Sequence, residues 1–371
     1  MRIGFDAKRA YCNFRGLGNY SRNTIAALTR LRPENEYFLF TPKIAPEFQN
    51  LLFQHSEIIT PQKTFDRALP SLWRSRGCIN DISSLNLDVF HGLSHELPFG
   101  IEKTKTKSVV TIHDLIFVSH PDLYHFADRK TYTLKYRHSC KTADKIIAIS
   151  EQTKADLINF WNVAEEKIDV VYQGCNPIFY EPVSQSEKEF VLTKYNLPSE
   201  YILNVGAIER RKNHELILRA LRQTSDSIPL VIVGRDNGNL QTLMKEFPEM
   251  FGKRVITLNS INDNELRAIY AGASLFVYPS TYEGFGIPII EALACGVPVV
   301  TTDDKCFREA GGDACHYINP HDHNQLAEEI SLLLNDYAAR SECVIRGAEQ
   351  IRQFSEENIA LNLSKIYESI L

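Results

Sequence analysis

The sequence lacks the features of a membrane-spanning, secreted or disulfide-linked chain. No stretch approaches the roughly 18 consecutive apolar residues that a membrane-spanning helix needs. The apolar run at the start of the chain is short and is interrupted by Asp6, so it predicts a buried strand rather than a signal peptide. The eight cysteines are scattered without a Cys-x-x-Cys pair, which argues against a disulfide framework and a thiolate zinc site. We therefore expect a cytoplasmic protein with free thiols.

The chain also lacks a strong net charge and a stripe of basic and aromatic residues. Its 41 Lys and Arg residues and 46 Asp and Glu residues give a formal net charge of −5. This balance argues against a partner made of nucleic acid. The charge is uneven, because residues 1–180 carry a net +4 and the rest of the chain a net −9. A basic first half fits an anionic partner, such as a phospholipid surface or a lipid diphosphate.

A chain of 371 residues is too long for one ordinary hydrophobic core, so two domains are expected. Short β-rich segments alternate with helical patterns, which predicts βαβ units and parallel sheets. We predict an α/β protein with two Rossmann-like, doubly wound domains that face a central cleft. The predicted parts are a first domain at 1–178, a proline-containing and charged linker at 179–198, a second domain at 199–354, and a C-terminal helix at 355–371 that packs back on the first domain.

The predicted elements follow the hydrophobic pattern. Strands are expected at residues 2–5, 37–41, 89–91, 108–111, 145–149 and 168–172, and then at 201–205, 230–233, 255–258, 275–278, 297–301 and 315–318. Helices are expected at residues 19–31, 152–160, 213–221, 241–246, 263–271, 289–294 and 324–334.

The strongest chemical signal is the segment 279–300, which reads PSTYEGFGIPIIEALACGVPVV. A predicted strand ends just before it, a glycine-rich turn follows, and Pro288 suits the first turn of a helix. Gly284 and Gly286 allow the backbone to approach a ligand closely. The N–H groups at the start of the helix attract an anion, so this turn predicts a phosphate site.

Two glutamates lie in the same segment. Glu283 falls in the turn, and Glu291 falls about one turn into the helix that follows, on the same side of the predicted site. Their spacing lets one carboxylate accept hydrogen bonds from sugar hydroxyls and the other from a ribose. The alternative is that Glu283 caps the helix and Glu291 lies on the surface.

A second motif, VGAIERRKN at 205–213, follows the first strand of the second domain and opens a helix. Arg211 can bind an anion through two hydrogen bonds, and Lys212 acts as a point charge. Such a pair would stabilise a diphosphate that gains charge as it leaves. No two aspartates are separated by a single residue, so the Asp-x-Asp pair that holds a diphosphate through a divalent ion is missing. The alternative is a solvated basic helix cap.

The segment with Glu283 and Glu291 resembles the donor-site signature of glycosyltransferase family four, the group 1 glycosyltransferases. The resemblance extends over most of the chain and is strongest across residues 204–320. It implies the GT-B fold and retaining transfer of a sugar from a nucleotide diphosphate, with Arg211 and Lys212 gripping the diphosphate. The substrate-binding residues that we expect in the second domain are Gly206, Arg211, Lys212, Gly234, Glu283, Gly284, Phe285, Gly286, Ile287 and Glu291.

The resemblance also points to two places in the first domain. Gly16 and Gly18, after Arg15, match the family's glycine-rich loop near the donor phosphate and the acceptor, although an ordinary tight turn is the alternative. His113 ends a strand where the family places a histidine against the donor sugar, so we expect it to contact the sugar and stabilise the transition state. The roles of four other residues stay open: His91, His95, Arg210 and Glu309.

The whole-chain pattern is most similar to mannosyltransferases that build bacterial surface polysaccharides. This similarity implies GDP-mannose as the first-choice donor, with UDP- and dTDP-hexoses close behind, and no cofactor besides the donor. The implied acceptor is a glycan or a lipid-linked oligosaccharide, which would allow peripheral contact with the inner membrane. A nucleotide-sugar epimerase with the GT-B fold is the main rival. An NAD-dependent enzyme is disfavoured, because the first-domain loop lacks the third glycine of a dinucleotide fingerprint.

Overall fold

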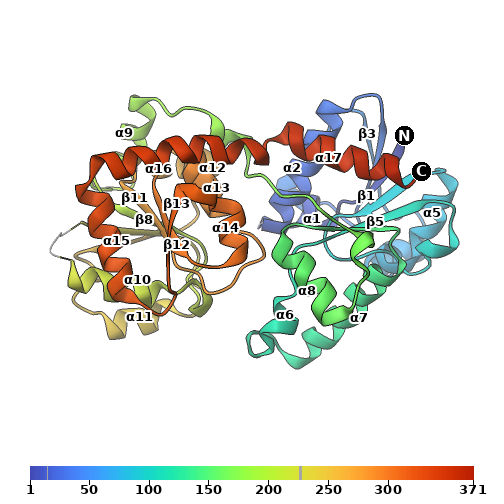
Figure 1. The fold of residues 1–371 in the computed structure, drawn as a ribbon. Helices are drawn as coiled ribbons and strands as arrows, with labels where there is room; N and C mark the ends of the chain where they lie inside the picture. The colour runs from blue at the N-terminus through green and yellow to red at the C-terminus, as the bar shows by residue number, and fades with distance from the viewer. Residues whose placement is uncertain (15, 225–227) are drawn as a thin grey trace. The chain divides into compact units, whose positions relative to one another are not determined.

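The computed structural model describes residues 1–14, 16–224 and 228–371, and the chain forms two compact units (Figure 1). The first unit comprises Met1–Gly174 and Phe354–Leu371, and the second comprises Cys175–Gln353. Each unit contains one parallel sheet. The predicted α/β class with two Rossmann-like domains is therefore confirmed. No helix in the described part of the chain combines the length and the apolar character that a membrane crossing requires.

The first unit contains a seven-stranded sheet with the order β3-β2-β1-β4-β5-β6-β7. Its strands β5 and β6 are buried on both faces, because Val109 and Ile147 join one core while Val110 and Ile146 join the other. The strand order reverses between β1 and β4, the place where ligands bind in such sheets. The strands are β1 (Arg2–Asp6), β2 (Glu36–Phe40), β3 (Ser56–Ile59), β4 (Val89–Gly92), β5 (Lys107–Ile112), β6 (Lys145–Ala148) and β7 (Ile168–Val170).

The second unit repeats this topology with a six-stranded sheet in the order β10-β9-β8-β11-β12-β13. The order reverses here between β8 and β11. The strands are β8 (Ile202–Val205), β9 (Leu230–Val233), β10 (Val255–Leu258), β11 (Leu275–Tyr278), β12 (Val299–Thr302) and β13 (Cys315–Ile318).

Helices join the strands in both units, as parallel pairing requires. Those of the first unit are α1 (Lys8–Cys12), α2 (Gly16–Leu31), α3 (Thr64–Ala68), α4 (Pro70–Leu72), α5 (Ile79–Ser84), α6 (Ile116–Ser119), α7 (Phe126–Thr142), α8 (Glu151–Trp161) and α17 (Glu356–Ser369). Those of the second are α9 (Gln185–Lys194), α10 (His214–Gln223), α11 (Leu240–Glu246), α12 (Asp263–Gly272), α13 (Ile287–Ala294), α14 (Lys305–Gly311), α15 (His323–Asn335) and α16 (Tyr337–Gln350).

The segment predicted as a linker, 179–198, lies within the second unit and contains α9. Ser184 and Glu187 form a capping box that starts this helix. Arg267 of α12 then pairs with Glu187 at 3.2 Å and with Glu181 at 3.1 Å. These contacts fix the segment to α12 of the second unit, which a proline-containing pattern alone did not reveal.

Helix α17 belongs to the first unit, although 179 residues of the second unit precede it in the chain. It packs against α2. Its side chains Leu363 and Tyr367 are fully buried in the core that also holds strands β1 and β5. The first unit is thus completed by the end of the chain.

Candidate functional site

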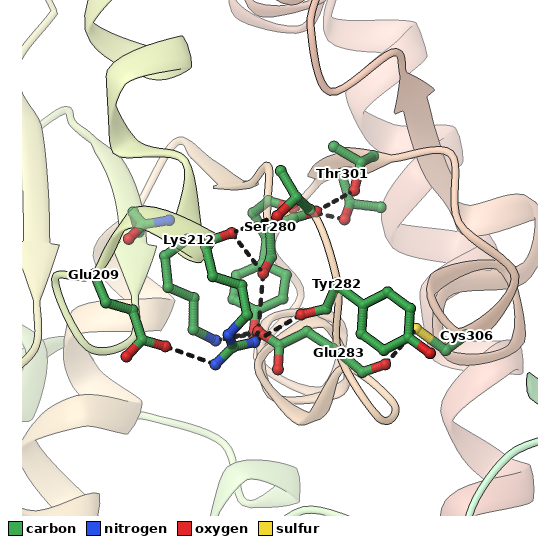
Figure 2. Close-up of polar contacts among 12 residues, drawn as sticks. Glu209, Lys212, Ser280, Tyr282, Glu283, Thr301 and Cys306 are labelled. Carbon is green, nitrogen blue, oxygen red and sulfur yellow. Dashed lines mark hydrogen bonds and ion pairs between the residues drawn. The ribbon is translucent and has the colours of Figure 1, made fainter. Parts of the chain in front are cut away.

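The residues predicted to hold a diphosphate lie where the strand order of the second sheet reverses. Strand β8 ends at Val205 and leads into the short 3₁₀ helix η7 (Arg210–Lys212). Strand β11 ends at Tyr278 and leads into the loop that carries Glu283. The two strands are neighbours in the sheet, so their carboxyl ends bring these segments together (Figure 2).

Glu283 is the centre of this cluster. Its Oε1 atom is contacted by the Lys212 ammonium, by Arg211 Nη1 at 2.5 Å, and by the hydroxyls of Tyr278 at 3.0 Å and Ser280 at 2.9 Å. Figure 2 shows the side chains of Lys212 and Ser280 directed toward Glu283. The two cations of one motif therefore converge on a carboxylate that lies 71 residues further along the chain.

The electrostatics of the cluster keep Glu283 ionised. Burial alone would raise its pKa, but the Lys212 and Arg211 charges outweigh that effect and lower the pKa to about 2. Burial lowers the pKa of Arg211, and the Glu283 carboxylate more than compensates, so that this pKa is raised. Arg211 also contacts Glu209 at 2.6 Å. Both predicted cations are thus paired with carboxylates.

The second oxygen of Glu283, Oε2, has no hydrogen-bond partner among the described residues. The Glu283 side chain keeps 16% of its surface exposed, so it is not sealed from solvent. One oxygen of Glu283 therefore orders the cations, and the other is available to a ligand hydroxyl.

Backbone contacts hold the loop and η7 together. The Thr281 N–H donates to the Arg211 carbonyl at 2.9 Å. The hydroxyls of Thr301 and Thr302, at the end of β12, donate to the carbonyls of Tyr278 at 2.7 Å and Ser280 at 2.6 Å. The position of the cations is thus set by three strand ends.

The turn that follows Glu283 ends in α13, as predicted. Gly286 is the N-cap residue, with φ of 135°, a backbone conformation that residues with a Cβ rarely adopt. Pro288 lies in the first turn, and no side chain caps the helix. The first N–H groups of a helix have no intrahelical acceptor, so this end of α13 can bind an anion. Gly284, Phe285 and Ile287 complete the turn.

Gly206 and Gly234 lie at the carboxyl ends of β8 and β9. The Gly206 N–H donates to the Val233 carbonyl at 2.9 Å. A Cβ atom on Gly234 would lie 1.8 Å from the Gly206 carbonyl oxygen, so only glycine permits this close approach. A Cβ atom on Gly206 would lie 3.3 Å from the Lys212 side chain, so this glycine lets Lys212 lie against the backbone at the end of β8.

Glu291 lies in α13, and its carboxylate is not on the surface. Its Oε2 accepts a hydrogen bond from the Tyr270 hydroxyl of α12 at 2.9 Å. Burial raises the pKa of Glu291 to about 7, and the Tyr270 hydrogen bond only partly offsets this effect. The alternative that Glu291 is a surface residue is therefore wrong.

His113 follows β5 in the first unit and is held tightly. Its Nε2 donates to the Leu93 carbonyl at 2.9 Å. The centroid of its ring lies 4.6 Å from that of the Tyr20 ring and 5.0 Å from that of the His95 ring. Burial lowers the pKa of His113 to about 4, a shift that the Leu93 hydrogen bond opposes and the Arg9 charge reinforces. The ring is therefore neutral at pH 7, and its unprotonated Nδ1 can accept a hydrogen bond.

Gly16 and Gly18 lie in the first turn of α2 rather than in a loop before it, so the prediction that the helix starts at residue 19 was three residues late. Arg15 lies outside the described residues. These glycines and His113 belong to the first unit, whereas the other predicted site residues belong to the second.

A charged cluster near the carboxyl end of β1 was not predicted. Arg74 contacts Asp6 at 2.5 Å and Glu96 at 2.9 Å, and it is almost buried. Lys8 has a pKa that is lowered by burial and by the Arg74 and Arg9 charges. The Nε of Arg9 is buried without a partner in the described ranges. Cations thus outnumber carboxylates at this sheet edge.

Sequence reasoning also missed Tyr278, Ser280 and Tyr270, which contact the two glutamates. Tyr278 ends an apolar strand and Tyr270 lies on the buried face of a helix, so both match ordinary core positions. Only Ser280, inside the 279–300 motif, carried a sequence signal.

Known families match this chain in both halves. The model described as Glycosyltransferase Family 4 matches residues 14–178, and the model described as Glycosyl transferases group 1 matches residues 185–350. The chain belongs to glycosyltransferase family four. The predicted resemblance is confirmed, and this glycosyltransferase is an enzyme of the hexosyltransferase type.

Individual relatives agree with the family. The O-antigen chain mannosyltransferase B of Escherichia coli is 29% identical over 99% of this chain and 100% of its own length. The O-antigen chain mannosyltransferase RfbU of Salmonella typhimurium is 31% identical over 62% of this chain and 64% of its own. The structure of sucrose-phosphate synthase from Thermosynechococcus elongatus has a TM-score of 0.81 at 23% identity, and the match covers 100% of this chain and 99% of that one. The glycosyltransferase therefore has the GT-B fold.

Proposed function

We propose that this glycosyltransferase transfers a hexose, with retention of configuration and without a metal ion, from a nucleotide diphosphate to a glycan or lipid-linked acceptor. The observation that carries the proposal is the convergence of Arg211 and Lys212 on Glu283, next to the uncapped start of α13. GDP-mannose is the first-choice donor, because two relatives that match 99% and 62% of this chain are named O-antigen mannosyltransferases. Surface-polysaccharide assembly is the process that these names support.

The second unit binds the donor in this mechanism. The diphosphate lies against Arg211, Lys212 and the N–H groups at the start of α13. As the glycosidic bond breaks, the leaving phosphate gains negative charge, and these fixed positive groups stabilise it. The leaving phosphate also takes the proton of the acceptor hydroxyl, so the reaction needs no separate base.

Glu283 and Glu291 divide the recognition of the donor. Oε2 of Glu283 accepts a hydrogen bond from a sugar hydroxyl, while Oε1 keeps the cations in place. Glu291 accepts from the ribose hydroxyls. The base lies near Gly234, at the carboxyl end of β9. His113 contacts the donor sugar as a neutral acceptor through Nδ1, because its Nε2 proton is committed to Leu93.

The donor is tested first by thermal unfolding with GDP-mannose, UDP-hexoses and dTDP-hexoses. GDP-mannose is expected to give the largest increase in melting temperature, since a ligand at 100 times its Kd stabilises the fold by about 2.7 kcal/mol. Transfer to a mannoside acceptor is expected to continue in EDTA and to give an α-linked product from the α-linked donor.

Three results would contradict this assignment. Stabilisation by a UDP- or dTDP-hexose alone would reassign the donor. Activity lost in EDTA and restored by Mg²⁺ would overturn the metal-free mechanism. Conversion of the donor sugar in the absence of any acceptor would favour the epimerase.

The acceptor is proposed to carry a phosphate that binds near Lys8 and Arg9. The excess of cations at the end of β1 and the unpartnered Arg9 Nε both favour an anion there. Arg9→Gln is expected to raise the KM of a lipid-diphosphate mannoside about tenfold or more, because a hydrogen bond between charged groups contributes roughly 1.5–3 kcal/mol. The KM of a phosphate-free alkyl mannoside is expected to stay unchanged.

Arg2→Gln is the matched control, because Arg2 lies at the opposite end of β1 and pairs with Glu36. An equal change in KM for both acceptors in the Arg9 variant would show that Arg9 does not bind the phosphate.

A lipid-linked acceptor would place the enzyme at the cytoplasmic face of the inner membrane, in peripheral contact. Phe65 and Leu69 are 65% and 46% exposed, and the cationic side chains of Lys63 and Arg67 lie beside them in the chain. Apolar side chains flanked by cations suit an anionic lipid surface. Trp73, which follows them, is buried and does not contribute.

A further inference from the structure

A series of hydrogen bonds crosses the core of the first unit, from the C-terminal helix α17 through β4 and β5 to Tyr20 in α2. The Tyr367 hydroxyl of α17 lies 2.7 Å from His91 Nδ1, and His91 Nε2 lies 2.8 Å from the Thr111 hydroxyl. The Thr111 hydroxyl lies 3.1 Å from the hydroxyl of Tyr20 in α2. The chain thus joins α17, β4, β5 and α2.

The series of hydrogen bonds ends at Tyr20, and the ring of Tyr20 packs against His113. Thr111 precedes His113 by two residues, and the Tyr20 ring meets the His113 ring edge to face at 4.6 Å and 89°. On its other side His113 contacts His95, which stacks on Tyr136 at 4.3 Å. His113 therefore lies between the rings of Tyr20 and His95, and the hydrogen bonds to Thr111 fix the Tyr20 ring.

The four groups of the chain are neutral and satisfied by one another. Burial lowers the pKa of His91 to about 3, so its ring stays neutral and presents one donor and one acceptor. Tyr367, His91 and Thr111 are all 0% exposed. Buried polar groups cost free energy unless every member is paired, and a fully paired network fixes the geometry of its surroundings.

The packing of α17 does not depend on this network. Helix α17 already packs against the first core through Ile359, Leu363 and Ile366, and a phenylalanine would fill the space of the Tyr367 ring. What the hydroxyl adds is a directional link over 276 residues of sequence to His91 in β4, and through His91 to Thr111 in β5. Directional links of this kind fix a neighbouring side chain in one orientation.

We infer that Tyr367 is a positioning residue, which acts through His91, Thr111 and Tyr20 to hold His113 in the orientation that the transfer reaction needs. The inference rests on the proposed contact between His113 and the donor sugar. It gives His91, whose role the sequence left open, a function as the central link. The last helix of the chain then completes the active site as well as the core.

The test compares Tyr367→Phe with Tyr37→Phe. Tyr37 is the matched control, since its hydroxyl is also buried in the first core but donates to the Leu28 carbonyl, away from His113. Tyr367→Phe is expected to lower kcat about tenfold with the donor KM unchanged, whereas Tyr37→Phe is expected to keep both values. Melting temperatures of both variants show how much of any loss comes from stability.

A double-mutant cycle with His113→Ala separates positioning from packing. In the His113→Ala background, Tyr367→Phe is expected to have no further effect on kcat, because the side chain that it positions is gone. Equal losses in both backgrounds, or equal kcat values for the Tyr367 and Tyr37 variants, would overturn the inference. Full activity of His113→Ala would instead reject the proposed contact of His113 with the sugar.

Tyr20→Phe provides a second route if Tyr367→Phe does not fold. It removes the last hydroxyl of the chain and leaves the ring against His113. The same loss of kcat, absent in the His113→Ala background, is expected. An unchanged kcat in this variant would contradict the inference equally.

Discussion

The Lys212→Ala and Arg211→Ala variants are each expected to lose roughly 10²–10³-fold in kcat, the usual effect of removing one group that stabilises charge in a transition state. In the proposed mechanism the charge on the diphosphate increases as the sugar leaves, so these cations would interact more strongly with the transition state than with the bound donor. The loss is therefore expected mainly in kcat and less in the donor KM. Steady-state kinetics with a saturating acceptor measure both values.

The control is Arg210→Gln. Arg210 is adjacent in η7, is exposed, and makes no side-chain contact to the glutamates of the site. This variant is expected to keep its activity within a factor of about two. Unchanged turnover in both the Lys212 and the Arg211 variants would reject their assignment to the leaving group, as would an equal loss in the Arg210 variant.

Much of the fold could be predicted because parallel strands buried on both faces give short apolar segments. The predicted segments overlap twelve of the thirteen strands found in residues 1–14, 16–224 and 228–371. The missing strand, β3 (Ser56–Ile59), lies at the edge of its sheet and is only partly buried, so its apolar signal is weak. The long helix α7 was also missed, because its buried residues are Tyr136, Ser139 and Cys140 and do not form an apolar stripe.

The site residues could be predicted one motif at a time, but their pairing could not. Arg211 and Glu283 were each expected to contact a ligand, and nothing in the sequence indicates that the two side chains form an ion pair with each other. That contact depends on β8 and β11 being neighbours in the sheet, a property of strand order rather than of local pattern. The link between His91 and Tyr367 is more remote still, since it depends on the chain returning to the first unit.

The pairing of Glu283 with two cations gives this residue the second large expected effect. Glu283→Gln keeps the size of the side chain and removes its charge, which leaves Arg211 and Lys212 close together without a buried carboxylate between them. Breaking a buried ion pair on one side costs about 3–5 kcal/mol of unfolding free energy. The variant is also expected to lose roughly 10²-fold or more in kcat, because the cations lose their fixed positions and the sugar loses the Oε2 acceptor. Urea unfolding and steady-state kinetics measure the two effects.

The pH dependence of the stability loss in Glu283→Gln shows whether the carboxylate charge causes it. The pKa of Glu283 is lowered to about 2 in the folded chain, below its ordinary value of 4.5, so the folded state holds the carboxylate more strongly ionised than the unfolded state does. The stability that it contributes is therefore complete above about pH 4.5 and is lost as the pH falls toward 2. The difference in unfolding free energy between the wild type and Glu283→Gln is expected to shrink over that range.

Glu181→Gln, which removes an exposed partner of Arg267, is expected to change neither kcat nor this pH dependence. A Glu283→Gln penalty that stayed constant from pH 7 to pH 3 would show that the carboxylate charge does not organise the site, and Arg211 and Lys212 would then need another explanation for their convergence.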